Sequence, residues 1–331
     1  MKLRKILTAV LSIIMLTGCN TTTKQTTENK KIQIVATTYP QYNWIQEIVG
    51  KDNDKFDVTL LMKNGSDLHS FQPTASDITK IADANLFVYV GGESDEWVED
   101  ALKQTNNSDM HVVNMLESIG SRAVEEEEKE GMQAEEEEEH EHEHDHDEVE
   151  YDEHVWLSLK NAQVLVKKIS EEIISLDEEN ESKYQANTDA YIAKLSSLDD
   201  EYQATVDQAS QKTLIFGDRF PFRYMVDDYG LDYYAAFVGC SAETEASFET
   251  VAFLAKKVDE LKVNHVLTIE GSDQKIAKTI INNTTEKNQD ILTLNSLQSV
   301  SQKDNENGIS YYDVMKENLS VLAKALDTEA Q

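Results

Sequence analysis

The chain has few of the residues that cross-link a fold or interrupt its helices and strands: its 331 residues include 2 Cys, 3 Pro and 12 Gly. Two Cys cannot form the disulfide framework of a small secreted domain, and so little Pro and Gly excludes a fibrous or wholly disordered chain. Positive charge is also scarce, with 30 Lys and Arg against 63 Asp and Glu. The formal net charge of −33 argues against nucleic acid as a partner and suits cations.

Long apolar runs are missing as well, apart from a short one at the start. Basic residues precede an apolar stretch from Ile6 to Leu16, which ends in Leu16-Thr17-Gly18-Cys19. The stretch is too short to span a membrane, and the order resembles a bacterial lipoprotein signal. We therefore predict a signal peptide over residues 1–18, a lipid on Cys19 that anchors the protein to the extracytoplasmic face of the membrane, and a flexible tether over residues 19–30.

What the chain has in excess is acid, concentrated in one segment. Glu125 to Glu153 holds eighteen carboxylates and the single Lys129, a charge of −17 and half of the total. The same segment contains four alternating imidazoles, at His140, His142, His144 and His146. Imidazole nitrogens beside carboxylate oxygens are the mixture that divalent transition metals prefer. We expect residues 121–150 to form a disordered loop that collects metal ions as an auxiliary site.

The rest of the chain alternates between strand and helix patterns, which predicts an α/β fold. Residues 31–177 form a first β/α lobe in this interpretation, and residues 212–331 form a second. Residues 178–211 contain no Gly or Pro and read as one long helix joining the lobes. Each lobe is expected to have its own central sheet.

Several motifs resemble one known family. Gly65-Ser66-Asp67-Leu68-His69-Ser70-Phe71-Gln72-Pro73, Asp152-Glu153-His154-Val155-Trp156-Leu157 and Tyr229-Gly230-Leu231 are similar to segments of the zinc/manganese solute-binding lipoproteins of ABC importers, the cluster A-I proteins. The resemblance covers nearly all of the mature chain, and the acidic His-rich insertion is similar to that of zinc-specific members. It implies two lobes around a cleft, a long helix that limits hinge motion, and a metal ion that is delivered to a membrane permease.

Both the chemistry and the resemblance single out two ligands, His69 and His154. Each lies where a strand-to-helix connection can aim an imidazole into a cleft. Asp67 and Asp152 are close enough in sequence to accept hydrogen bonds from the ring N–H groups.

The second lobe departs from the family pattern. Relatives place His or a carboxylate where this chain has Arg219, and an Asp where it has Asn295. Arginine offers only donors, so the neighbouring Asp218 is the candidate ligand, provided that the strand ends by Phe216 or Gly217. Glu243 is a second candidate. Cys240 is a possible soft ligand, but a small buried thiol is the safer interpretation.

Two classes of function remain at this point. The first is a binding protein, not an enzyme, that captures Zn²⁺ or else Mn²⁺ as a monomer and passes it to a permease; the same site would also serve a surface metal buffer or an adhesin. The second is an extracellular zinc hydrolase. The absence of a His-Glu-x-x-His motif favours the binding protein.

Overall fold

A computed structural model describes residues 31–50, 53–63, 65–105, 107–133, 150–241, 245–300 and 302–330. The predicted signal peptide, the tether and several candidate residues lie outside this part of the chain: Cys19, His140, His142, His144, His146 and Glu243. In the described residues no helix is long and apolar enough to cross a membrane.

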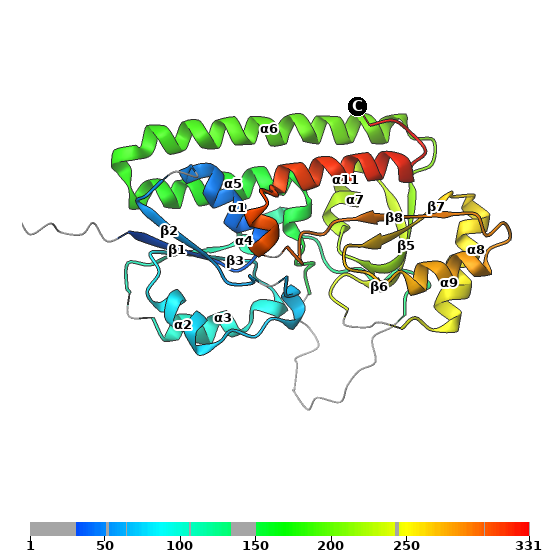
Figure 1. Ribbon diagram of the computed structural model, residues 1–331, viewed down its shortest axis with the longest axis horizontal. Coiled ribbons are helices and arrows are strands. Elements are labelled where there is room, and N and C mark those ends of the chain that lie inside the picture. The colour runs from blue at the N-terminus through cyan, green and yellow to red at the C-terminus, as the bar shows by residue number, and fades with distance from the viewer. Residues whose placement is uncertain are drawn as a thin grey trace, which may run out of the picture. The chain divides into compact units, whose positions relative to one another are not determined.

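The first lobe is built on a four-stranded parallel sheet in the order β2-β1-β3-β4 (Figure 1). Side chains of β1 alternate, so that Ile34 and Ala36 enter the main core while Val35 packs into a separate cluster on the other face. The strands are β1 (Ile32–Ala36), β2 (Phe56–Leu60), β3 (Leu86–Tyr89) and β4 (His111–Asn114), and the helices are α1 (Tyr39–Val49), α2 (Ala75–Ala82), α3 (Trp97–Lys103), α4 (Met115–Ile119) and α5 (Leu159–Leu176).

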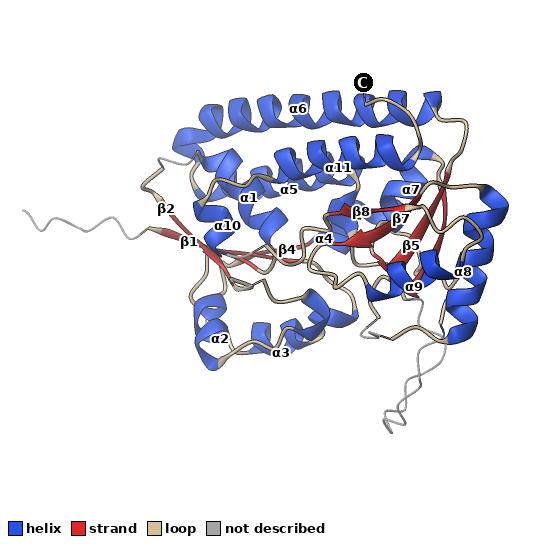
Figure 2. Cartoon of the chain, turned by 45° about the vertical axis from the view of Figure 1, so that its right-hand side comes forward, coloured by secondary structure: helices blue, strands red, loops and turns tan. Residues whose placement is uncertain are grey.

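The second lobe repeats this plan with a parallel sheet in the order β6-β5-β7-β8 (Figure 1), and Figure 2 shows α8 and α9 beside it. Helices α8 and α9 cover one face, where Leu254 and Ile280 are fully buried. The strands are β5 (Thr213–Phe220), β6 (Asp232–Val238), β7 (His265–Ile269) and β8 (Asp290–Leu294), and the helices are α7 (Arg223–Tyr229), α8 (Phe248–Leu261), α9 (Lys275–Asn283) and α11 (Tyr311–Ala325). The short helix α10 (Gln302–Glu306) lies near α1 of the first lobe (Figure 2). The predicted two-lobed α/β fold is confirmed.

The predicted long helix is α6 (Glu181–Gln208), whose 28 residues extend about 42 Å. It contacts α1 and α5 of the first lobe as well as α7 and α11 (Figure 1). The hydroxyl of Tyr202, which is fully buried, donates to the carbonyl of Met315 over 2.6 Å. One core continues beneath α6 from Ile34 in the first lobe to Phe216 in the second. A shared core of this kind restricts hinge motion between the lobes.

One part of the predicted disordered loop is ordered and packed. Residues 123–133, which we call the strap, leave the first lobe and lie against the second. Met132 is 9 % exposed, and the backbone N–H of Gln133 donates to the carbonyl of Ala236 over 3.0 Å. Lys129 pairs with Asp232. A disordered loop that starts at residue 121 does not fit these contacts, because the strap has an apolar side chain to bury and backbone partners to bond.

Candidate metal centre

His69 lies in a short 3₁₀ turn, Leu68–Ser70, that follows β2 and a loop. The carboxylate of Asp67 caps this turn by accepting the backbone N–H of His69 over 3.1 Å. The ring Nδ1 of His69 lies 2.8 Å from the hydroxyl of Ser94 and 3.4 Å from a carboxylate oxygen of Glu153. With Nδ1 engaged as a donor, Nε2 keeps its lone pair and points away from these partners.

His154 is fully buried at the start of the turn Val155–Leu157. The carboxylate of Asp152 holds it twice, because one oxygen accepts the backbone N–H over 2.8 Å and lies 3.1 Å from the ring Nδ1. Trp156 packs edge-on against the imidazole at a centroid distance of 5.4 Å. Asp152 therefore lies where the sequence predicted, and it leaves Nε2 as the free nitrogen of His154.

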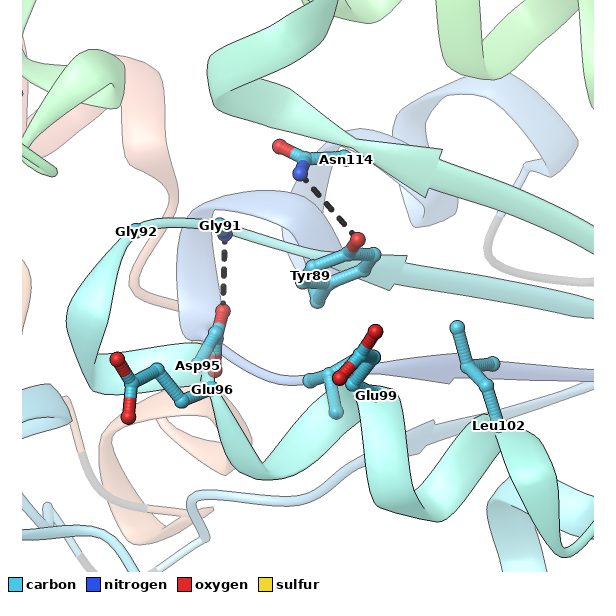
Figure 3. A pocket seen from close by; sticks show the side chains of 9 residues that line it. Tyr89, Gly91, Gly92, Asp95, Glu96, Glu99, Leu102 and Asn114 are labelled. Carbon is cyan, nitrogen blue, oxygen red and sulfur yellow. Dashed lines mark hydrogen bonds between the residues drawn. The ribbon is translucent and has the colours of Figure 1, made fainter. Parts of the chain in front are cut away.

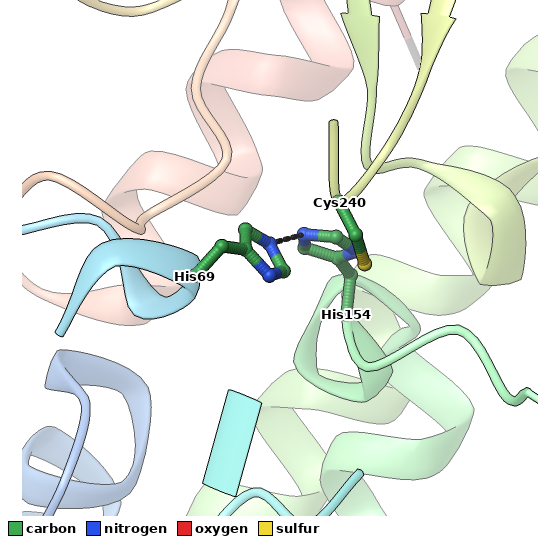
Figure 4. A group of neighbouring side chains, drawn as sticks. All are labelled: His69, His154 and Cys240. Carbon is green, nitrogen blue, oxygen red and sulfur yellow. Dashed lines mark hydrogen bonds between the residues drawn. The ribbon is translucent and has the colours of Figure 1, made fainter. Parts of the chain in front are cut away.

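The two histidines point their Nε2 atoms at each other over 3.2 Å (Figure 4). Without a metal ion, this distance requires one ring to donate a proton to the other. With Zn–N bonds of about 2.05 Å, two nitrogens on one tetrahedral Zn²⁺ lie about 3.3 Å apart. The pair is therefore spaced for a zinc ion in place of the shared proton.

The third member of the group is Cys240, just beyond the carboxyl end of β6 (Figure 4). Among the described residues, the ligand atoms of His69, His154 and Cys240 all lie within 4.8 Å of one another. Gly239 makes this approach possible, since a Cβ at its position would lie 3.0 Å from Cε1 of His154 and 2.9 Å from the carbonyl oxygen of Phe220. The sequence favoured a small buried thiol for Cys240, because nothing local reveals that its loop returns to His154.

The electrostatics of the group keep the His69 ring neutral, and a neutral imidazole has a lone pair to offer a metal ion. Burial, and then the neighbouring His154, lowers the pKa of His69 to about 3, so its ring is neutral at pH 7. Burial opposes the protonation of His154, but the carboxylate of Asp152 outweighs it and raises the pKa. Burial, reinforced by Glu126, raises the pKa of Cys240 above its ordinary value. The carboxylates of Asp152 and Glu126 are thus placed to stabilise positive charge in the group.

Asp218 does not belong to this group. The sequence made its role depend on an early end of β5, but the strand continues to Phe220 with a shift of its register between Phe216 and Arg219. One carboxylate oxygen of Asp218 instead accepts the backbone N–H of Ile269 over 3.4 Å. Successive strand side chains point to opposite faces, so it is Arg219 that reaches the first lobe. Its guanidinium donates to Asp67 over 2.5 Å and to the carbonyl of Ser241 over 3.3 Å.

The other second-lobe positions are engaged in hydrogen bonds within the lobe. The side-chain oxygen of Asn295 accepts the backbone N–H of Leu297 over 2.8 Å. Glu270 accepts from the backbone N–H of Ser296 over 2.7 Å and from its hydroxyl over 2.8 Å. Glu270 is not part of the group formed by His69, His154 and Cys240. Glu243 lies outside the described residues and stays a prediction.

A hollow of about 450 Å³ lies in the first lobe, and none of His69, His154 and Cys240 lines it (Figure 3). It is lined by Tyr89, Asp95, Glu99 and Asn114, among others. The carboxylate of Asp95 accepts the backbone N–H groups of Val90 and Gly91 over 2.8 and 3.0 Å. These bonds hold the loop after β3, so Asp95 has a structural role.

Comparison with known proteins gives one consistent family. A family model described as zinc-uptake complex component A, periplasmic, matches residues 34–325. The high-affinity zinc uptake system protein ZnuA of Bacillus subtilis is 34 % identical over 316 residues, which are 95 % of this chain and 94 % of that protein.

Two solved structures are similar in fold. The metal-dependent lipoprotein YcdH from Bacillus subtilis has a TM-score of 0.71 and 32 % identity, and the match covers 89 % of this chain and 99 % of that one. Zn(II)-bound AdcA from Streptococcus pneumoniae has a TM-score of 0.70 and 29 % identity, with 91 % of this chain covered. The match spans only 59 % of AdcA.

Proposed function

This chain belongs to the ZnuA family of zinc-uptake components, and from that premise we propose that His69 and His154 hold its Zn²⁺ between the two lobes. Members of the family are the extracytoplasmic zinc-binding components of ABC importers. The ion is therefore cargo, captured outside the cell and released to a permease.

One observation carries the assignment of the ligands, namely the 3.2 Å between the two Nε2 atoms. Each ring is oriented by a partner on its Nδ1, Ser94 and Glu153 for His69 and Asp152 for His154. Rings held in this way need no rearrangement to bind the ion, which reduces the entropy cost of binding.

The choice of zinc over manganese follows from the donor atoms. Manganese prefers oxygen ligands, whereas imidazole nitrogen and sulfur suit zinc. Among the described residues, the group within 4.8 Å contains two imidazoles and a thiol and no carboxylate. We therefore propose Zn²⁺ as the physiological cargo, with Mn²⁺ binding more weakly.

The location and the partners complete the proposal. The N-terminal signal pattern supports a lipid anchor on Cys19, which would hold the protein beside its permease. YcdH, which is described as a metal-dependent lipoprotein, agrees with this arrangement. We propose that the protein acts as a monomer, because one chain brings both histidines together.

Calorimetric titration of Zn²⁺ into the metal-free protein tests the assignment. Substituting His69→Ala and His154→Ala together should abolish the tight site and leave the fold, since lobes of this size need no structural metal. His111→Ala is the matched control, because His111 pairs with Glu172 on α5, outside the group. Tight one-to-one binding that persists in the double variant would refute the assignment.

A further inference from the structure

We propose that Cys240 is the zinc ligand that the second lobe contributes, through its Sγ atom as a thiolate. This inference rests on the proposed function and adds the third ligand to it. The sulfur lies within 4.8 Å of a ring nitrogen of His69 and of a ring nitrogen of His154, and among the described residues of this group Cys240 is the member that comes from the second lobe.

The distances leave little movement for coordination. With a Zn–S bond of about 2.3 Å and Zn–N bonds of about 2.05 Å, the sulfur and nitrogen ligands of a tetrahedral ion lie about 3.6 Å apart. The group already lies within 4.8 Å, so an inward shift of the Cys240 side chain of about 1 Å is enough. The thiol would lose its proton to solvent as the Zn–S bond forms.

The loop that carries Cys240 is held in place for this role from two sides. On one side, Gly239 packs closely between the ring of His154 and the carbonyl oxygen of Phe220. A Cβ at this position would lie 3.0 Å from Cε1 of His154 and 2.9 Å from that oxygen. The backbone N–H of Cys240 itself donates to Glu126 of the strap over 3.4 Å. Arg219, the residue at the family's usual ligand position, donates to the next carbonyl, that of Ser241.

A Cys240 ligand would explain why this chain can have Arg219 where relatives have a metal ligand. Arg219 cannot bind a cation, and Asp218 is turned to Ile269, so β5 supplies no ligand. Cys240 lies in the turn that directly follows β6, the strand that neighbours β5 in the same sheet. A ligand from this loop would tie the second lobe to the ion that the first lobe binds. A thiolate would also favour zinc over manganese.

Replacement of Zn²⁺ by Co²⁺ tests the inference. Zn²⁺ is d¹⁰ and has no useful absorption spectrum. Co²⁺ in the same site gives a charge-transfer band in the near ultraviolet when a thiolate is bound to it. The full chain would carry Cys19→Ser throughout, which leaves Cys240 as the sole thiol of a sequence with 2 Cys. The parent loaded with Co²⁺ should show the band, and Cys240→Ser should lack it.

Zinc affinity gives the second measurement. Cys240→Ser should bind Zn²⁺ at least tenfold more weakly, since loss of a ligand costs more than the roughly 10- to 100-fold cost of losing a hydrogen-bond partner of a ligand. The ratio of Zn²⁺ to Mn²⁺ affinity should fall as well. Thermal unfolding of the metal-free Cys240→Ser and Cys240→Ala variants checks that the fold is kept.

The outcomes separate this inference from the proposed function. A parent protein without the band, or a Cys240→Ser variant that binds Zn²⁺ as tightly as the parent, would overturn the role of Cys240. If the double histidine variant still lost the tight site in that case, the proposed function would stand without the thiolate. Persistence of the tight site in both variants would remove both proposals.

Discussion

Arg219 and Asp67 join the two lobes beside the metal group, with a guanidinium nitrogen 2.5 Å from a carboxylate oxygen. Both side chains are only about one-fifth exposed, at 19 % and 23 %. Burial alone would raise the pKa of Asp67, but the hydrogen bond from Arg219 reverses the shift and lowers it. The pair therefore neutralises a positive charge that would otherwise face the incoming cation.

The first prediction distinguishes two roles of Asp67: neutralising the charge of Arg219, or merely connecting the two lobes. Asp67→Asn leaves the guanidinium unpaired and should weaken Zn²⁺ binding about tenfold, as expected for an uncompensated unit charge within several ångströms of a divalent ion. Arg219→Met leaves the Asp67 carboxylate without its partner. This variant should bind Zn²⁺ more tightly than Asp67→Asn does, and even as tightly as the parent or more so. Calorimetry on both variants at low salt measures the difference. Equal losses of Zn²⁺ affinity in the two variants would indicate that the ion pair only connects the lobes.

Asp152 provides the second prediction. Asp152→Asn removes the charge that orients the His154 ring and raises its basicity, while an oxygen remains to accept the backbone N–H. Zinc affinity should fall by about 10- to 100-fold, the usual cost of losing such a partner. Asp232→Asn is the matched control, because it removes the charge that pairs with Lys129 at the strap and keeps an oxygen to accept the backbone N–H of Tyr233. Similar losses in the two variants would contradict a specific role for Asp152.

The third prediction concerns stability and pH. Burial raises the pKa of Asp95 to about 6, against an ordinary value near 3.8, although two backbone N–H groups partly compensate. A carboxyl with a raised folded-state pKa stabilises the fold below its unfolded pKa, and this contribution is lost as pH rises through the folded value. The free energy of unfolding should thus lose roughly 3 kcal/mol from this group between about pH 4 and pH 6.

Urea unfolding across that pH range checks the expected loss. Asp95→Asn should have a flatter pH profile than the parent, so that the difference between the two proteins changes between about pH 4 and pH 6 and is constant outside it. Glu99→Gln is the control, since Glu99 lies on α3, four residues after Asp95, and its side chain is 84 % exposed. If the free energies of unfolding of Asp95→Asn and the parent change with pH in parallel, Asp95 does not make the predicted contribution.

The fourth prediction concerns the acidic segment, whose histidines lie outside the described residues. Replacing residues 134–148 by a short Gly-Ser linker spares the strap and its contacts with Cys240 and Ala236. The variant should lose weak extra zinc equivalents and capture zinc more slowly at low ionic strength, because the segment's charge attracts cations. The affinity of the tight site should be nearly unchanged.

A charge-preserving control divides the two roles of this segment. Substituting His140, His142, His144 and His146 by Asn keeps the carboxylates, so it should remove the weak equivalents and retain the fast, salt-dependent capture. Stopped-flow kinetics with a zinc-sensitive dye at two salt concentrations measures the rate. Loss of the tight site in the linker variant would mean that the segment supplies a ligand to it.

Local patterns in the sequence were sufficient for the architecture. Strand and helix periodicity predicts the two β/α lobes, and an uninterrupted helical stretch near residues 178–211 predicts α6, because these features depend on neighbouring residues along the chain. His69 and His154 could be singled out for a similar reason, since each stands in a short motif that ends a strand or opens a turn.

Only the tertiary structure decided how the second lobe meets these histidines. At the register shift in β5, Asp218 accepts from Ile269 and Arg219 donates to Asp67, and no local pattern encodes that arrangement. Cys240 is 86 residues from His154 in the chain, yet Gly239 lets its loop pack directly against the imidazole. Which side chains surround the ion depends on contacts between segments far apart in sequence, and those exist only once both sheets and their shared core have formed.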